Sequence, residues 1–161
     1  MKHTISVIVD NKPGVLSRVA GLFSRRNFNI ESLAVGTTED PTVSRMTIVV
    51  EGDEKTLEQI IKQLYKLINV IRVFDIPKDM SVERGLMLIK VSITEKTRPE
   101  ILELVDIFHG KIVDVSEKAV IIEMTGDEEK IAGMEKLLKK FGIKELVRTG
   151  KIALERGMEQ D

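Results

Sequence analysis

Hydrophobic and polar residues alternate along short stretches of this chain, and longer stretches with helical spacing separate them. At 4–9 the alternation has a period of two, which is typical of a strand with one buried face. Apolar residues then recur every three or four positions up to Phe23, which predicts an amphipathic helix. A second helix should begin after Asp53 as its N-cap and bury a stripe that ends at Ile68. The remaining strands of this half are predicted at 27–35, 44–51 and 70–76.

The same order of patterns returns in the second half of the chain. Alternation at 87–94 predicts a strand, and a capping box of Thr97 and Glu100 predicts the start of a helix that ends at His109 and Gly110. A hairpin is expected at 111–115 and 119–125. The next helix should begin at 126–128 and bury Leu137, and a last strand is expected at 143–148.

Each half therefore reads β-α-β-β-α-β, the order of a ferredoxin-like unit. We predict an α+β protein with two tandem ferredoxin-like units, whose antiparallel sheets carry helices on one face. The expected domains are 1–77 and 86–161, joined by a polar linker at 78–85. The tripeptide Gly-Asp-Glu stands between a strand and a helix in both halves, at 52–54 and 126–128.

Composition and charge exclude several classes of function. The chain has 161 residues and a formal net charge of −1, from 25 basic and 26 acidic residues, so a nucleic-acid partner is not expected. It contains no cysteine, and His3 and His109 lack a suitably spaced partner, so no metal site is expected. No apolar run approaches the ~20 residues that span a bilayer, and no signal peptide precedes the first strand. We therefore expect a cytoplasmic protein without a membrane partner.

The turn between the first strand and the first helix carries the most informative chemistry. It reads Asn-Lys-Pro-Gly at 11–14. A helix that begins here aims unpaired backbone N–H groups at its surroundings, and the helix dipole adds partial positive charge. Gly14 has no Cβ to block close approach, and Asn11 offers an amide that both donates and accepts. These groups suit the carboxylate and ammonium of a free amino acid, whereas the turn holds no nucleophile and no general base.

The sequence 11–33, which contains Gly-Leu-Phe-Ser-Arg-Arg-Asn-Phe-Asn-Ile-Glu-Ser-Leu, is followed by Asp-Pro at 40–41 and Ser-Arg-Met-Thr-Ile at 44–48. Together these motifs resemble the small regulatory subunits of acetolactate synthase, and the first half resembles their amino-acid-sensing ACT domain. The second half agrees in length and predicted layout. Asn27 is a departure, since this family more often has glycine there.

The resemblance implies a chain without a catalytic residue or a cofactor of its own. It implies a large catalytic subunit as partner, which would hold thiamine diphosphate, magnesium and FAD. The chain would activate that subunit and make it sensitive to valine, or to isoleucine or leucine. Two ACT domains would pair edge to edge as a homodimer, with an effector site at the seam. One side of the site would come from Asn11, Pro13, Gly14, Val15 and Leu16, and the other from Asn29 and Ile30 of the partner subunit.

Two other functions known for this topology are disfavoured by the sequence, and a third remains open. An RNA-recognition module needs stacking aromatic residues, but only 4% of the chain is aromatic. An acylphosphatase-like hydrolase would need an arginine in the first loop, and the first arginine, Arg18, falls inside the predicted helix. A stand-alone ACT sensor that regulates a different protein remains an alternative.

Overall fold

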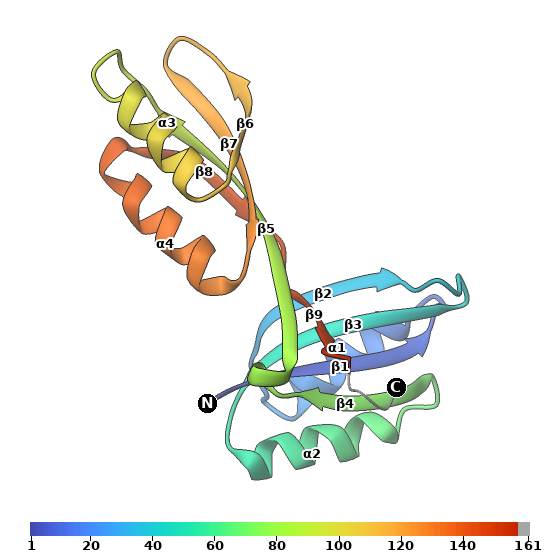
Figure 1. Ribbon diagram of the computed structural model, residues 1–161. Coiled ribbons are helices and arrows are strands. Elements are labelled where there is room, and N and C mark those ends of the chain that lie inside the picture. Colours follow the sequence, from blue (N-terminus) through green and yellow to red (C-terminus); the bar gives the residue numbers. More distant parts are fainter. Residues whose placement is uncertain (158–161) are drawn as a thin grey trace. The chain divides into compact units, whose positions relative to one another are not determined.

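Two β-α-β-β-α-β units follow one another in the computed structural model, which describes residues 1–157 (Figure 1). Among the described residues, the first unit comprises 1–82 and 152–157, and the second comprises 83–151. Both sheets are antiparallel, so the prediction of two tandem ferredoxin-like units is confirmed.

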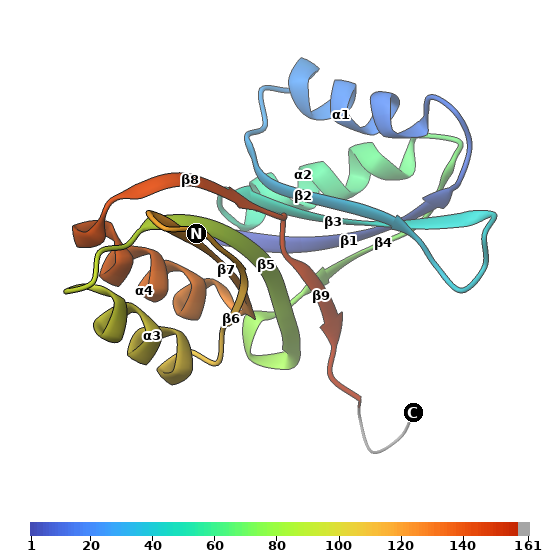
Figure 2. The ribbon, with the colours of Figure 1, turned by 90° about the horizontal axis from the view of Figure 1, so that it is seen from above.

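In the first unit, four strands and two α-helices form the β-α-β-β-α-β layout, and β9 joins them. Its sheet has the order β2-β3-β1-β4. Helices α1 and α2 cover one face, and β9 lies on the other (Figure 2). The elements are β1 (Lys2–Asp10), α1 (Val15–Arg25), β2 (Ile30–Thr37), β3 (Val43–Glu51), α2 (Glu54–Tyr65), β4 (Val70–Ile76) and β9 (Ile152–Glu155).

The second unit repeats this layout with the sheet order β6-β7-β5-β8, and its two helices lie on one face of the sheet (Figure 2). β9 also pairs with β5. The elements are β5 (Ser81–Ser92), α3 (Arg98–Ile107), β6 (Lys111–Val115), β7 (Ala119–Gly126), α4 (Glu128–Leu138) and β8 (Ile143–Arg148).

Each unit has its own hydrophobic core between its helices and its sheet. In the first unit, Phe23 and Ile60 from the helices meet strand residues such as Ile48, and all three are at most 1% exposed. In the second, Met134 packs against strand residues such as Ile122. Asp53 and Asp127 cap the helices that follow them, since each carboxylate accepts a hydrogen bond from a backbone N–H three residues on. The equivalent Gly-Asp-Glu tripeptides therefore serve the same structural purpose.

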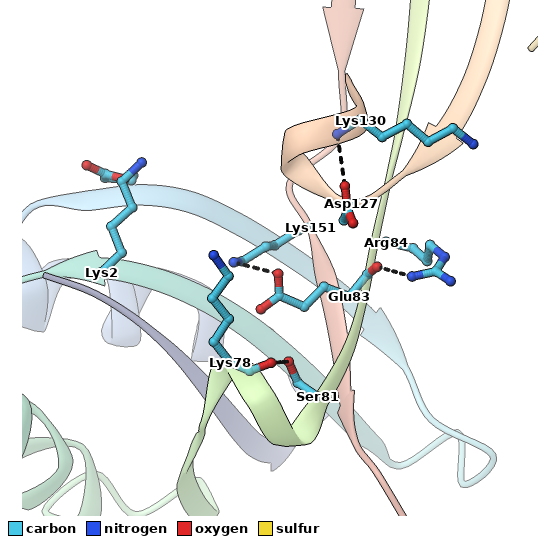
Figure 3. Close-up of polar contacts among 9 residues, drawn as sticks. Lys2, Lys78, Ser81, Glu83, Arg84, Asp127, Lys130 and Lys151 are labelled. Atoms are coloured by element: carbon cyan, nitrogen blue, oxygen red, sulfur yellow. Dashed lines mark hydrogen bonds and ion pairs between the residues drawn. The ribbon is translucent and has the colours of Figure 1, made fainter. Parts of the chain in front are cut away.

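The segment expected to be a linker, 78–85, is structured. Lys78–Met80 forms a 3₁₀ turn, and β5 begins directly after it at Ser81. Ser81 is 6% exposed, and its hydroxyl donates to the Lys78 carbonyl at 3.1 Å (Figure 3). The polar composition of 78–85 suggested a linker. The local pattern of hydrophobic and polar residues does not reveal that β9, far away in the sequence, supplies a strand partner for β5.

The C-terminal end of the chain also differs from the expected second domain. Glu83 at the start of the second unit forms an ion pair with Lys151, at 3.1 Å, and both side chains are largely buried (Figure 3). Beyond Lys151 the chain enters the first unit as β9, although the expected domain ran from 86 to 161. Residues 158–161 of that expected domain lie outside the described residues.

Three local expectations about the helices fail, and they concern a helix end, a buried face and a cap. α2 ends at Tyr65, so Ile68 stands in the following turn and is 97% exposed. Leu137 is 44% exposed because its neighbour Leu138 takes the inward position. Thr97 does not cap α3; its hydroxyl instead accepts from the Thr94 N–H at 2.9 Å.

The connection from α1 to β2 is built on a left-handed residue. Asn27 has φ 57°, a conformation that asparagine tolerates better than most residues. The next residue, Phe28, donates its N–H to the Phe23 carbonyl at 2.9 Å and places its ring edge-on to that of Phe23. β2 therefore begins at Ile30 rather than at 27. Asn29 lies immediately before it.

Candidate functional site

The turn between β1 and α1 is closed by backbone hydrogen bonds that leave donors free at the start of the helix. The Val15 N–H donates to the Lys12 carbonyl at 3.3 Å, and the helical ladder starts with Arg18 N–H to Gly14 carbonyl at 3.0 Å. The N–H groups of Leu16 and Ser17 precede that ladder and have no intrahelical acceptor. They are the backbone donors that this helix offers to an anionic group.

Gly14 stands at the N-cap position with φ 84° and ψ −9°. This left-handed conformation favours glycine, which is a reason for Gly14 independent of any ligand. A Cβ at this position would meet no protein atom within 4 Å. The space beside the helix start is therefore open, as close approach by a ligand would need.

Asn11 is held against the β2–β3 connection. Its backbone N–H donates to the Thr42 carbonyl at 2.8 Å, and its side-chain Nδ2 donates to the Pro41 carbonyl at 2.9 Å. Since the amide nitrogen is used in this way, the side-chain oxygen is the group left to accept a hydrogen bond from a ligand.

Asp40 stiffens the connection that holds Asn11. Its carboxylate accepts from the Thr42 N–H at 2.9 Å and from the Thr42 hydroxyl at 2.7 Å. These two hydrogen bonds, that of the hydroxyl first, lower the pKa of Asp40 from its ordinary value. This support was not predicted from the sequence, although an Asp two residues before a Thr is a recognisable turn signal.

We predict that acid loosens this turn. Because the pKa of Asp40 is lower in the folded protein, its stabilising contribution is present above the unfolded value, about 3.9, and is lost as the pH falls through the folded value. An NMR titration should therefore show the Thr42 amide shifting with a midpoint below that value. Asp40→Ala should abolish this step, and Asp106→Ala, at an exposed aspartate of α3, should leave it unchanged. A midpoint at or above the ordinary value would contradict the prediction.

The predicted residues Val15 and Leu16 play different parts. Val15 is 4% exposed and belongs to the core, and its N–H is already bonded within the turn, so it supports the helix start rather than facing a ligand. Leu16 is 46% exposed and is free to contact a molecule beside the turn. Pro13 lies in the turn itself and is exposed.

Asn29 and Ile30 lie at the opposite end of the same sheet. Ile30 pairs with Val50 of β3, which pairs with His3 at the start of β1. Asn11 follows the other end of β1. Eight residues of extended strand, roughly 26 Å, separate these two ends. One subunit therefore does not bring Asn29 and Ile30 to the turn at 11–14.

A second polar cluster flanks the turn and was not predicted. Asn69, in the turn before β4, donates its Nδ2 to the Asp10 carboxylate at 3.2 Å and accepts from Arg18 Nη1 at 2.6 Å. The Asp10 N–H also donates to the Asn69 carbonyl at 2.9 Å. Asn69 is more than 50 positions away from both Asp10 and Arg18, so no local pattern reveals that it holds the end of β1 to the start of α1.

The corresponding turn of the second unit leaves fewer backbone donors free. The Thr97 N–H donates to the Thr94 hydroxyl at 3.2 Å, and the Arg98 N–H donates to the Thr94 carbonyl at 2.9 Å. Pro99 has no N–H, and Glu100 adds negative charge in the first turn. This helix start is therefore less suited to a carboxylate than the start of α1.

Other kinds of site find no support in the part of the chain that the structure describes. Within residues 1–157, no three acidic or histidine side chains gather in an arrangement that would hold a metal ion. No helix among these residues is both long enough and apolar enough to cross a bilayer.

Comparisons with known proteins match both units. A family model described as the AHAS small subunit-like ACT domain matches residues 5–72, and one described as the small subunit of acetolactate synthase matches residues 84–157. A probable acetolactate synthase small subunit from Archaeoglobus fulgidus is 61% identical over 157 residues, which are 98% of each chain. The acetolactate synthase small subunit of Mycobacterium leprae is 52% identical over 155 residues, 96% of this chain and 92% of the relative.

The crystal structure of the acetolactate synthase small subunit from Thermotoga maritima has a TM-score of 0.92 and 47% sequence identity, and covers 98% of this chain and 99% of that chain. The agreement thus extends through the second unit, for which the sequence motifs were weak. Because relatives of more than half identity match over almost their whole length, this chain belongs to the family of acetolactate synthase small subunits.

Proposed function

We propose that two copies of this chain bind a free branched-chain amino acid, valine or a close relative, between their first units, and that binding inhibits the catalytic large subunit that they otherwise activate. The observation that supports this proposal is the separation of the predicted site into two halves at opposite ends of one sheet. Family membership makes acetolactate synthase a better-supported target than the different protein that a stand-alone sensor would regulate.

Two-fold pairing would reunite the halves. β2 is an outer strand of its sheet. When two identical edges pair about a two-fold axis, the strands run antiparallel and each end meets the opposite end of its partner. The end of β2 at Thr37 lies beside the 38–42 connection that holds Asn11. The start of β2 in the partner subunit, with its Asn29 and Ile30, would then approach Asn11 and Leu16.

The chemistry of such a seam fits a zwitterion with a small apolar side chain. The N–H groups of Leu16 and Ser17 would take the carboxylate, and the side-chain oxygens of Asn11 and of the partner subunit's Asn29 would take the ammonium. Leu16 and the partner subunit's Ile30 would cover an isopropyl group. A sensor that works between micromolar and millimolar effector needs only about −8 to −4 kcal/mol. Apolar pockets separate one methylene by about 1–3 kcal/mol, so valine, isoleucine and leucine remain candidates.

Regulation requires that the effector bind two arrangements of the dimer unequally, because differential affinity is the source of any shift. A site shared by two subunits meets that condition, since any change in their pairing alters the distance between its halves. We expect thiamine diphosphate, magnesium and FAD to belong to the large subunit and not to this chain.

Reconstitution tests the proposal. Acetolactate formation by the large subunit should rise when this chain is added, and should fall again with at least one of valine, isoleucine and leucine. The large subunit alone, with each amino acid, is the control and should not respond. If the chain binds the large subunit but changes neither its rate nor its response to amino acids, the proposed regulation is wrong.

A further inference from the structure

The sheet of the first unit has two outer strands, β2 and β4, and both are potential pairing sites for a second copy. An outer strand presents backbone N–H and C=O groups that another strand can bind. Proteins that assemble through one edge must keep the other from pairing, because two open edges permit growth into an extended sheet.

Tyr65 satisfies the outer edge of β4 at its middle residue. The Tyr65 hydroxyl donates to the Val73 carbonyl at 3.1 Å and accepts from the Val73 N–H at 3.0 Å. In an antiparallel ladder the N–H and C=O of one residue point the same way. Both groups of Val73 reach Tyr65 on α2, so they point to the side of β4 that faces away from β1. A further strand would otherwise bind on that side. One hydroxyl therefore makes the two hydrogen bonds that a neighbouring strand would make there.

The surroundings of this edge favour association. Three large apolar side chains near it are at least half exposed: Tyr65 at 50%, Ile71 at 52% and Ile68 at 97%. An outer strand beside exposed apolar side chains is a site at which copies associate when its backbone is free. A side-chain hydroxyl that binds the edge backbone can prevent such association while the apolar side chains stay in place.

We propose that the Tyr65 hydroxyl closes the β4 edge, so that a second copy of this chain pairs through β2 and the assembly stops at that pair. This inference rests on the proposed β2 pairing, and it adds the residue that decides which edge is used.

Tyr65→Phe tests the inference, because it removes the hydroxyl and keeps the ring. Sedimentation velocity over a wide range of protein concentration should show one dimeric species for the wild type and concentration-dependent larger species for Tyr65→Phe. The matched control is Thr56→Val, which removes a hydroxyl of the same helix that donates to Asp53 at 2.9 Å and lies away from the edge. It should sediment as the wild type does. A folded Tyr65→Phe variant with the wild-type size at every concentration would overturn the inference.

Hydrogen exchange on the wild type provides a test that no folding failure can affect. Asp75 lies two residues beyond Val73 on the same edge, and among the described residues its backbone has no comparable side-chain cap. The Val73 amide should exchange about tenfold more slowly than the Asp75 amide, as one hydrogen bond would produce. Equal rates would overturn the inference. Neither readout depends on acetolactate formation, so failure of the cap and failure of the proposed regulation are separately visible.

Discussion

A mixed dimer of one Asn11→Ala subunit and one Asn29→Ala subunit is expected to bind one effector molecule with wild-type affinity, although neither homodimer does so. In each homodimer both sites have lost one amide. In the mixed dimer both substitutions fall in the same site, and the other site keeps both amides. Each amide would contact a charged ammonium, an interaction of about 1.5–3 kcal/mol, so each homodimer should bind roughly 10–150-fold more weakly.

Calorimetric titration of differently tagged, co-purified dimers measures this directly. The matched control pairs a wild-type subunit with one that carries both substitutions. It has the same number of changes but no intact site, because each site then lacks one amide. If the site lay within a single subunit, the control would bind and the mixed dimer would not. That reversed result would exclude the proposed seam.

Replacing Gly14 by leucine is expected to abolish feedback inhibition while leaving activation of the large subunit intact. The leucine side chain would occupy the open space beside the N–H groups of Leu16 and Ser17, where the carboxylate should bind. The left-handed backbone at φ 84° should also cost about 1–2 kcal/mol of stability with any residue that has a Cβ. The rate of acetolactate formation with rising valine measures the feedback, and thermal unfolding measures the cost.

Gly142→Ala separates the loss of the site from the loss of stability. Gly142 also has a positive φ, 96°, but lies in the second unit, where a Cβ would make ordinary contacts with Ser92 at 3.5 Å or more. This variant should lose stability and keep its response to valine. Retained feedback in the Gly14→Leu variant would show that the effector binds elsewhere.

Local patterns predicted the elements of both units well, because amphipathic period and capping act within a few residues. Asp53 caps its helix as expected, the helix predicted to begin at 126–128 does begin there, and the left-handed His109 ends α3 where it was predicted to end. The small errors lie at helix ends and on helix faces, and the larger one lies where a long-range partner overrides local composition. The polar start of β5 looked like a linker because β9 is about 70 residues away in the sequence.

The candidate site shows the same division. The residues of the site were proposed from a motif and stay a prediction. The tertiary structure decided which of their groups are free to bind a ligand. The Val15 side chain is buried and therefore does not face a ligand, and the Pro41 carbonyl orients the Asn11 amide. The distance that separates Asn29 from Asn11 follows from strand register.

By itself, the amino-acid sequence determined the order of strands and helices, the capped start of α2 and the turn at 11–14 that opens α1. These depend on backbone conformation and on contacts between near neighbours. Only the tertiary structure decided where β9 pairs, which residues support the turn at 11–14, and that the tyrosine at the end of α2 covers the β4 edge. Such contacts join residues far apart in the chain, and their free energy exists only once the strands are in register.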